Sequence, residues 1–190
     1  TGDKWNRYIF RTGRNSSQDA ISNAIAIGTP GTVIATLAQD YAFGRDGVAA
    51  FKKALEKTGA KVVYEEYAPP TTTDFTAPYQ RIFNALDKEK GRKLIWVVWA
   101  GASNPLTPLK SLDYRTHGIG VATGGNILPA LVSYKDFPGL EGAEYYYYDS
   151  IKNPVNACLL AAPENHLHHT PAFFTCGGFA AEMSVVAALE

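Results

Sequence analysis

The chain has 190 residues, of which 46% are hydrophobic and 19% charged, a balance that excludes a disordered or fibrous protein. Eighteen basic residues offset eighteen acidic ones and no basic run is present, so neither nucleic acid nor an anionic membrane is predicted as a partner. No stretch approaches the roughly 20 apolar residues of a membrane-spanning helix.

Apolar runs rich in β-branched residues alternate with amphipathic segments, which predicts strands alternating with helices. The run 32–38 is apolar at nearly every position, as is typical of a strand buried on both faces. Strands are predicted at 32–38, 61–67, 93–99, 119–122 and 141–148. Helices are predicted at 18–27, 44–58, from a cap at Thr73 or Asp74 to 88, and at 105–112, 128–134, 155–160 and 173–190.

This alternation predicts an α/β fold of three layers, a parallel sheet with helices on both faces. Small ligands of such sheets bind beyond the carboxyl ends of the strands. The loops that follow the five predicted strands are 39–44, 67–74, 101–105, 123–127 and 149–154.

The first of these loops has neither the glycine pattern of a dinucleotide site nor that of a P-loop, so no cofactor is predicted. Instead it carries Tyr41 and Phe43, whose rings can stack on or enclose an organic ligand. The alternative is that both rings only pack the loop.

Other loop residues are candidates with two readings each. Gly124 and Gly125, followed by Asn126, indicate either a tight turn with positive φ or the close approach of a ligand. Trp99 lies at the end of its predicted strand and is either a core residue or part of the pocket wall. Tyr148 is a candidate for ligand contact, because it is the tyrosine of 145–148 nearest the strand end.

No pattern of catalytic or metal-binding residues emerges. His166, His168 and His169 have no cysteine or carboxylate set at metal-site spacing, so we interpret them as a solvated polar stretch with no metal. The nucleophile motif G-x-S-x-G is missing as well. Cys158 and Cys176 either form a disulfide or remain free.

Six segments together resemble one family, the extracellular solute receptors of the branched-chain amino acid type, which serve ABC transporters. Residues 6–18 are similar to the segment that crosses from the first lobe of these receptors to the second. The others resemble motifs of that second lobe and are 40–44 (DYAFG), 72–76 (TTDFT), 123–129 (TGGNILP), 139–142 (GLEG) and 152–156 (KNPVN).

The resemblance implies a lobe of the type I periplasmic-binding-protein fold, in which two lobes joined by three hinge strands close on a ligand. Residues 1–14 would be the hinge crossover and 15–190 the second lobe, cut from a longer protein. That longer protein would include a first lobe, would meet a membrane permease, and would be periplasmic or lipid-anchored outside the cell. It would bind its ligand without being an enzyme.

The polar start at 1–5 and the single methionine, Met183, also fit a mature or excised piece. Residues 157–170 depart from the family, which has a long charged helix there, because Pro163 interrupts or kinks a helix.

The resemblance also implies ligand-binding positions. Phe43 and Phe174 match aromatic residues that touch ligand in amino-acid-binding relatives. Ala102 matches a frequent tyrosine, and Gly124 matches an acidic residue that holds the ammonium group of the ligand. Because a buried unpaired ammonium is costly, we expect an aromatic or aliphatic carboxylate or an amide rather than a plain aliphatic α-amino acid.

Two other readings stay open. A ligand-sensing domain of a cytoplasmic amide or amino-acid regulator would share this fold, and so would an enzyme on a nucleotide-binding α/β fold.

Overall fold

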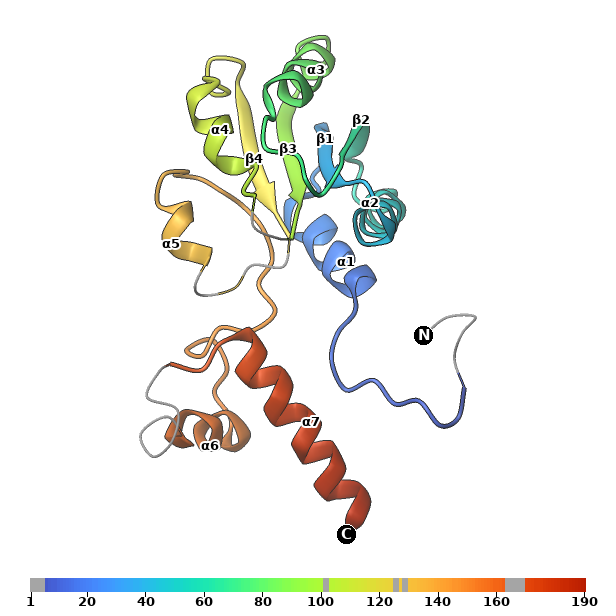
Figure 1. Cartoon of the computed structure of the whole chain (residues 1–190), viewed down its shortest axis with the longest axis vertical. Helices are drawn as coiled ribbons and strands as arrows, with labels where there is room; N and C mark the ends of the chain where they lie inside the picture. Colours follow the sequence, from blue (N-terminus) through green and yellow to red (C-terminus); the bar gives the residue numbers. More distant parts are fainter. Residues whose placement is uncertain (1–5, 101–102, 125–126, 128–129, 163–169) are drawn as a thin grey trace. The chain divides into compact units, whose positions relative to one another are not determined.

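The computed structural model describes residues 6–100, 103–124, 127, 130–162 and 170–190. The chain divides into two compact units, which we describe separately (Figure 1). One consists of Ser16–Asn126 and Ala130–Ala143, and we call it the sheet unit. The other consists of Thr1–Asn15, Ile127–Pro129 and Glu144–Glu190, and we call it the terminal unit.

The sheet unit is built on four parallel strands in the order β2-β1-β3-β4. The two inner strands, β1 and β3, have the most continuous apolar runs, because helices cover them on both sides. The parallel α/β fold predicted from the sequence is therefore confirmed. The strands are β1 Thr32–Gln39, β2 Lys61–Ala68, β3 Arg92–Val98 and β4 Ile119–Thr123.

Helices pack on both faces of the sheet, so the predicted three layers are present (Figure 1). Alternate β1 residues separate the two layers, since Val33 and Leu37 face α3 and α4 while Ile34 faces α1 and α2. On the α2 side, Phe51 and Trp96 stack with ring centroids 3.7 Å apart. The helices of this unit are α1 Ser16–Ile27, α2 Ala42–Leu55, α3 Thr76–Leu86, α4 Leu106–Ser111 and α5 Leu131–Tyr134.

Local signals located the helix ends to within a few residues. The predicted N-cap of α3, Thr73 or Asp74, is wrong by at least one residue, because Phe75 is the N-cap and makes no side-chain cap hydrogen bond. The Asp74 carboxylate, one residue earlier, accepts a hydrogen bond from the Thr76 backbone N–H at 2.9 Å. Gly59, directly after the predicted helix 44–58, has a φ of 79° and lies four residues beyond the last residue of α2.

The predicted fifth strand, 141–148, is wrong. Glu141 makes a single parallel bridge to Ala122, with hydrogen bonds to the neighbouring residues of β4. Two residues later the backbone N–H of Ala143 donates to the Asn23 side chain at 3.0 Å, and the following tyrosines belong to the terminal unit. The high strand propensity of tyrosine is therefore not matched by a partner strand.

The terminal unit contains two helices, α6 Pro154–Ala162 and α7 Phe173–Leu189. The interruption predicted at Pro163 falls outside the described residues and stays a prediction. Near the start of α7, the Arg14 guanidinium lies 3.9 Å from the ring centroid of Phe173 and 5.2 Å from that of Tyr145.

Helix α7 is apolar along its length, yet none of its residues is buried in the described part of the chain. Phe174 and Leu189 expose 72% and 82% of their surface. Exposed apolar area of this extent is typical of a surface that another part of a protein covers.

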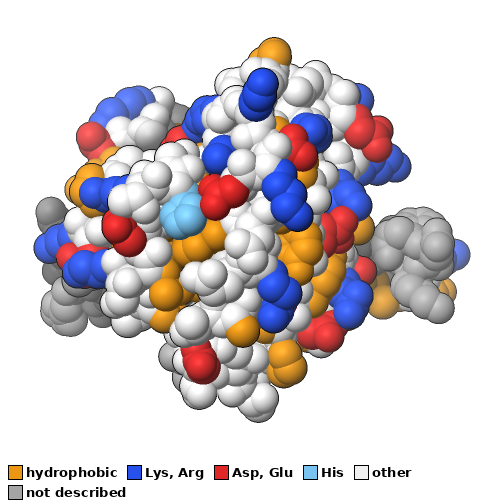
Figure 2. Space-filling view, turned by 90° about the horizontal axis from the view of Figure 1, so that it is seen from above, with side chains coloured by type: hydrophobic (Ala, Val, Ile, Leu, Met, Phe, Trp, Pro, Cys, Tyr) orange, Lys and Arg blue, Asp and Glu red, His pale blue; other side chains and the backbone are white. Residues whose placement is uncertain are grey.

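On the view from above, positive and negative side chains are interspersed rather than segregated (Figure 2). Among the described residues, no helix combines the length and the apolar character needed to cross a membrane.

Gly44, in the first turn of helix α2, lies against the backbone of the last residue of strand β1. A Cβ atom added there would lie 2.1 Å from the Gln39 carbonyl oxygen, so the Gly44→Ala variant must displace backbone. We expect it to lower the free energy of unfolding by about 2–3 kcal/mol, as overpacking does. The measurement is urea denaturation.

The matched control is Gly47→Ala, three residues along the same helix. Its added Cβ would lie at an ordinary 3.5 Å from Val98 Cγ1, and alanine favours the helix, so stability should rise by up to about 1 kcal/mol. Equal effects of the two substitutions would contradict the close approach at Gly44.

Candidate functional site

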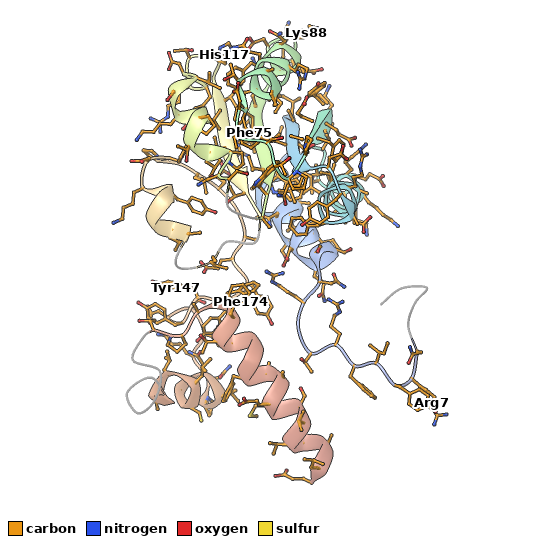
Figure 3. All side chains as sticks on the ribbon, in the orientation of Figure 1. Arg7, Phe75, Lys88, His117, Tyr147 and Phe174 are labelled. Atoms are coloured by element: carbon orange, nitrogen blue, oxygen red, sulfur yellow. The ribbon has the colours of Figure 1, made fainter. Side chains whose placement is uncertain are left out.

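The candidate site is the edge of the sheet at which all four parallel strands end. Backbone hydrogen bonds hold the first residues beyond the strands, since Asp40 N donates to Ala68 O at 2.8 Å and Gly124 N to Val97 O at 3.4 Å. The loops at this edge are therefore anchored to neighbouring strands. Lys88 and His117, labelled in Figure 3, lie in connections at the opposite, amino edge.

The loop between β1 and α2 presents two aromatic rings. Tyr41 and Phe43 stack with centroids 5.8 Å apart and an interplanar angle of 29°. Tyr41 is exposed, whereas Phe43 is half-buried against the core between the sheet and helices α1 and α2. Phe43 thus packs the loop and keeps part of its surface open, so the structure is compatible with both sequence readings.

The acidic residue of the same loop is already paired. The Asp40 carboxylate lies 2.5 Å from a guanidinium nitrogen of Arg45. The guanidinium carbon of Arg45 also lies 4.5 Å from the ring centroid of Tyr67. Tyr67 in turn donates a hydrogen bond to Glu65 at 2.8 Å, and burial together with this carboxylate raises the pKa of Tyr67 to about 12. Asp40 therefore offers no free counter-charge to a ligand.

Trp99 lies one residue beyond β3 and belongs to both core and edge. Its ring meets that of Phe75 edge-on at 5.1 Å, and its indole N–H donates to the Ser103 hydroxyl at 3.2 Å. Phe75, labelled in Figure 3, is fully buried directly before α3, so Trp99 connects two of the edge loops. Ala102, the next predicted position, lies outside the described residues.

Gln39, the last residue of β1, was missed by the sequence reasoning. Its side-chain amide donates to the Ala100 carbonyl at 2.6 Å and accepts from the Ala100 N–H at 3.1 Å. Only 2% of Gln39 is exposed. The available signal was a polar residue at the end of an otherwise apolar strand, because a buried polar side chain requires partners.

Gly124 does not adopt a positive φ, so the tight-turn reading is not met at this residue. A Cβ atom here would lie at ordinary contact distances, 3.4 Å from Trp96 and 3.5 Å from the Asn23 side chain, so packing does not require a glycine and the close approach of a ligand stays a prediction. Gly125 and Asn126 lie outside the described residues.

Two predicted ligand residues belong to the terminal unit. Tyr148 is half-buried beside Tyr147, with ring centroids 4.8 Å apart, and its carbonyl accepts a hydrogen bond from Asn156. Phe174 is exposed in the first turn of α7, next to Phe173 (Figure 3). Contact of either residue with ligand stays a prediction.

Within the part of the chain that the structure describes, no group of three histidine, cysteine or carboxylate side chains is arranged to hold a metal ion. His166, His168 and His169 lie outside that part. Cys158 and Cys176 are free thiols, so the disulfide alternative is not realised.

The edge therefore presents aromatic surface and anchored backbone. The described carboxylates of its loops are engaged, Asp40 by Arg45 and Asp74 by the Thr76 N–H. Such a surface suits an apolar or aromatic organic molecule better than a cation.

A model of the periplasmic binding protein family matches residues 1–190, and the chain belongs to this family. Its members are solute-binding proteins of transporters rather than a class of enzyme. No curated protein matches the chain.

Solved structures agree with this assignment. An ABC-type branched-chain amino acid transporter protein of Rhodopseudomonas palustris CGA009 is 64% identical over 99% of this chain and 51% of its own, with a TM-score of 0.91. A solute-binding protein of R. palustris BisB5, in complex with 3,4-dihydroxybenzoic acid, is 26% identical over 96% of this chain and 50% of its own, with a TM-score of 0.71.

A third, from R. palustris HaA2 with p-hydroxybenzoic acid, is 26% identical over 83% of this chain and 43% of its own, with a TM-score of 0.63. The chain thus spans about half the length of these relatives.

The hydrogen bond accepted by Asp74 gives a pH-dependent prediction. The hydrogen bond from the Thr76 backbone lowers the pKa of Asp74, so the carboxylate stabilises the fold above the unfolded-state pKa of about 3.9 and loses this effect as pH falls further. We expect Asp74→Ala to reduce thermal stability at pH 7, by a margin that narrows below about pH 4. Calorimetry across this range measures it.

The control is Asp74→Asn, which keeps an oxygen acceptor for the Thr76 N–H without a titrating charge. Its difference from the Asp74→Ala variant should be nearly independent of pH. A difference in thermal stability between wild type and Asp74→Ala that stays constant down to about pH 2 would argue against a contribution from the Asp74 charge.

Proposed function

We propose that this chain is half of the solute-binding component of an ABC importer, located in the periplasm or lipid-anchored outside the membrane. It captures an aromatic carboxylate of the hydroxybenzoate kind between two closing lobes and releases it unchanged to the permease. Residues 1–14 act as hinge crossover, and the sheet edge supplies one wall of the site.

The main observation behind this proposal is the composition of the edge. Tyr41 and Phe43 stack there, and Trp99 lies partly open beside Phe75. The Asp40 carboxylate is neutralised by Arg45. A planar, apolar ring with its negative charge turned away from this wall matches these features, whereas an α-ammonium group beside Tyr41 and Phe43 would find the Asp40 carboxylate already paired with Arg45.

The relatives support the same ligand class. The two binding proteins with 26% identity were solved with 3,4-dihydroxybenzoic and p-hydroxybenzoic acid. Both ligands are single aromatic rings that carry one carboxylate.

Branched-chain amino acids are the second candidate. The relative with 64% identity is described as a branched-chain amino acid transporter protein, which favours this ligand. Its ammonium group would need an acidic partner, however, and Gly124 has replaced the acidic residue that the family resemblance implies at that position. A cytoplasmic regulator of the same fold is a further alternative.

The partner most directly supported is the other half of the protein. Relatives are about twice as long as this chain, and α7 exposes an apolar surface that a further lobe would cover. Contact with the permease is proposed from the family alone.

Ligand class is tested on the intact protein by calorimetry. We expect 4-hydroxybenzoate and 3,4-dihydroxybenzoate to bind with dissociation constants of about 1 µM or lower, equivalent to about 8 kcal/mol, and leucine not to bind detectably. Mass spectrometry of small molecules retained on purification is an independent check. Nanomolar affinity for leucine would refute the aromatic ligand.

Phe43 is the residue whose replacement should report most directly on this wall. Loss of one ring contact is worth about 1.4 kcal/mol, so Phe43→Ala should weaken binding of 4-hydroxybenzoate about tenfold. Phe43→Leu keeps most of the apolar volume and should lose less. Unchanged affinity in a folded Phe43→Ala variant would remove Phe43 from the site.

A further inference from the structure

The buried side chain of Gln39 extends the hydrogen bonding between β1 and the β3 side beyond the last backbone pair of the two strands. The ladder between β1 and β3 ends at the pair Ala38 and Val98, whereas β1 and β2 still pair at Gln39 and Ala68. The backbone of Gln39 is thus held on the β2 side. On the β3 side its side-chain amide forms the two-bond pair with Ala100, as a peptide group would.

Gln39 also determines where the loop with Tyr41 and Phe43 begins. The Gln39 carbonyl accepts a hydrogen bond from the Tyr41 N–H at 2.9 Å. The backbone of Gly44 lies against the same carbonyl, since a Cβ atom added to Gly44 would be 2.1 Å from the carbonyl oxygen. The loop is therefore closed on the backbone of Gln39 at both ends.

The second loop joined by Gln39 is the one that starts at Trp99. Ala100 follows Trp99 directly, and Trp99 in turn contacts Phe75 and Ser103. Moving Ala100 would therefore shift the aromatic surface of this loop relative to Tyr41 and Phe43.

We infer that Gln39 is a positioning residue, which fixes the spacing between the Tyr41–Phe43 loop and the Trp99 loop and so sets ligand affinity at this edge. The inference rests on the proposed function. Gln39 itself is buried among its partners and needs no contact with ligand.

The test uses three substitutions in the intact protein with 4-hydroxybenzoate as probe. Gln39→Met keeps the length of the side chain but removes both hydrogen bonds. Gln39→Glu keeps an acceptor for the Ala100 N–H, but its carboxylate faces the Ala100 carbonyl. Gln80→Met is the matched control, because Gln80 is exposed on α3 rather than buried at a strand end.

We expect Gln39→Met to weaken binding at least tenfold and to speed amide hydrogen exchange in peptides covering 99–104, without faster exchange in α3. Gln80→Met should behave as wild type. Binding by Gln39→Met within twofold of wild type would overturn the inference, as would a uniform acceleration of exchange that marks general destabilisation.

Gln39→Glu adds a pH profile that a merely space-filling role would not produce. A protonated carboxyl group donates to the Ala100 carbonyl and accepts from its N–H, as the amide does. Burial raises the pKa of such a carboxyl group, so affinity relative to wild type should be nearly restored at about pH 5.5 and lost at about pH 8. A flat profile would contradict the paired geometry.

Failure of the proposed function is a separate outcome. If the wild-type protein does not bind 4-hydroxybenzoate, the ligand class is wrong, while exchange in the ligand-free variants still decides whether Gln39 holds the Trp99 loop.

Discussion

The parallel ladder around β1 is the constraint on which the candidate site depends. Every residue of β1 is buried, because strands flank it and helices cover both faces. Since all four strands run in one direction, the loops at their carboxyl ends meet at one edge. Polar groups at the end of β1 must then find partners inside the protein, and Gln39 finds them in Ala100. Apolar burial thus builds the scaffold, and the pair of Gln39 with Ala100 links two loops of the candidate site.

Charged and aromatic side chains at the edge differ in how far they remain available to a ligand. Charged groups there are satisfied within the protein, as Asp40 is by Arg45, and an exposed pair of this kind contributes little to stability. The aromatic groups Tyr41, Phe43 and Trp99 are only partly covered. Recognition at such a surface would depend on shape and ring contact more than on charge, which is consistent with a chain whose formal net charge is zero.

Much of the fold could be predicted because its signals are local. The apolar runs gave β1 and β3, and Asp74 marked the start of α3. The segment 141–148 failed because strand formation needs a partner, and Asn23 takes the backbone donor of Ala143 instead. The pairing of Gln39 with a residue 61 positions away has no local signature. Sequence therefore located the loops of the site but not the contact that connects them.

The absence of a side chain at Gly44 has an evolutionary consequence. Helix α2 rests directly on the backbone of β1 there, so main-chain geometry constrains the path of the intervening loop without a contribution from the exposed ring of Tyr41. Exposed rings on such a loop can be exchanged with little disturbance to the scaffold beneath them. If the loop contacts solute as proposed, a lineage carrying this glycine can vary the exposed ring by single substitutions while inheriting one unchanged framework.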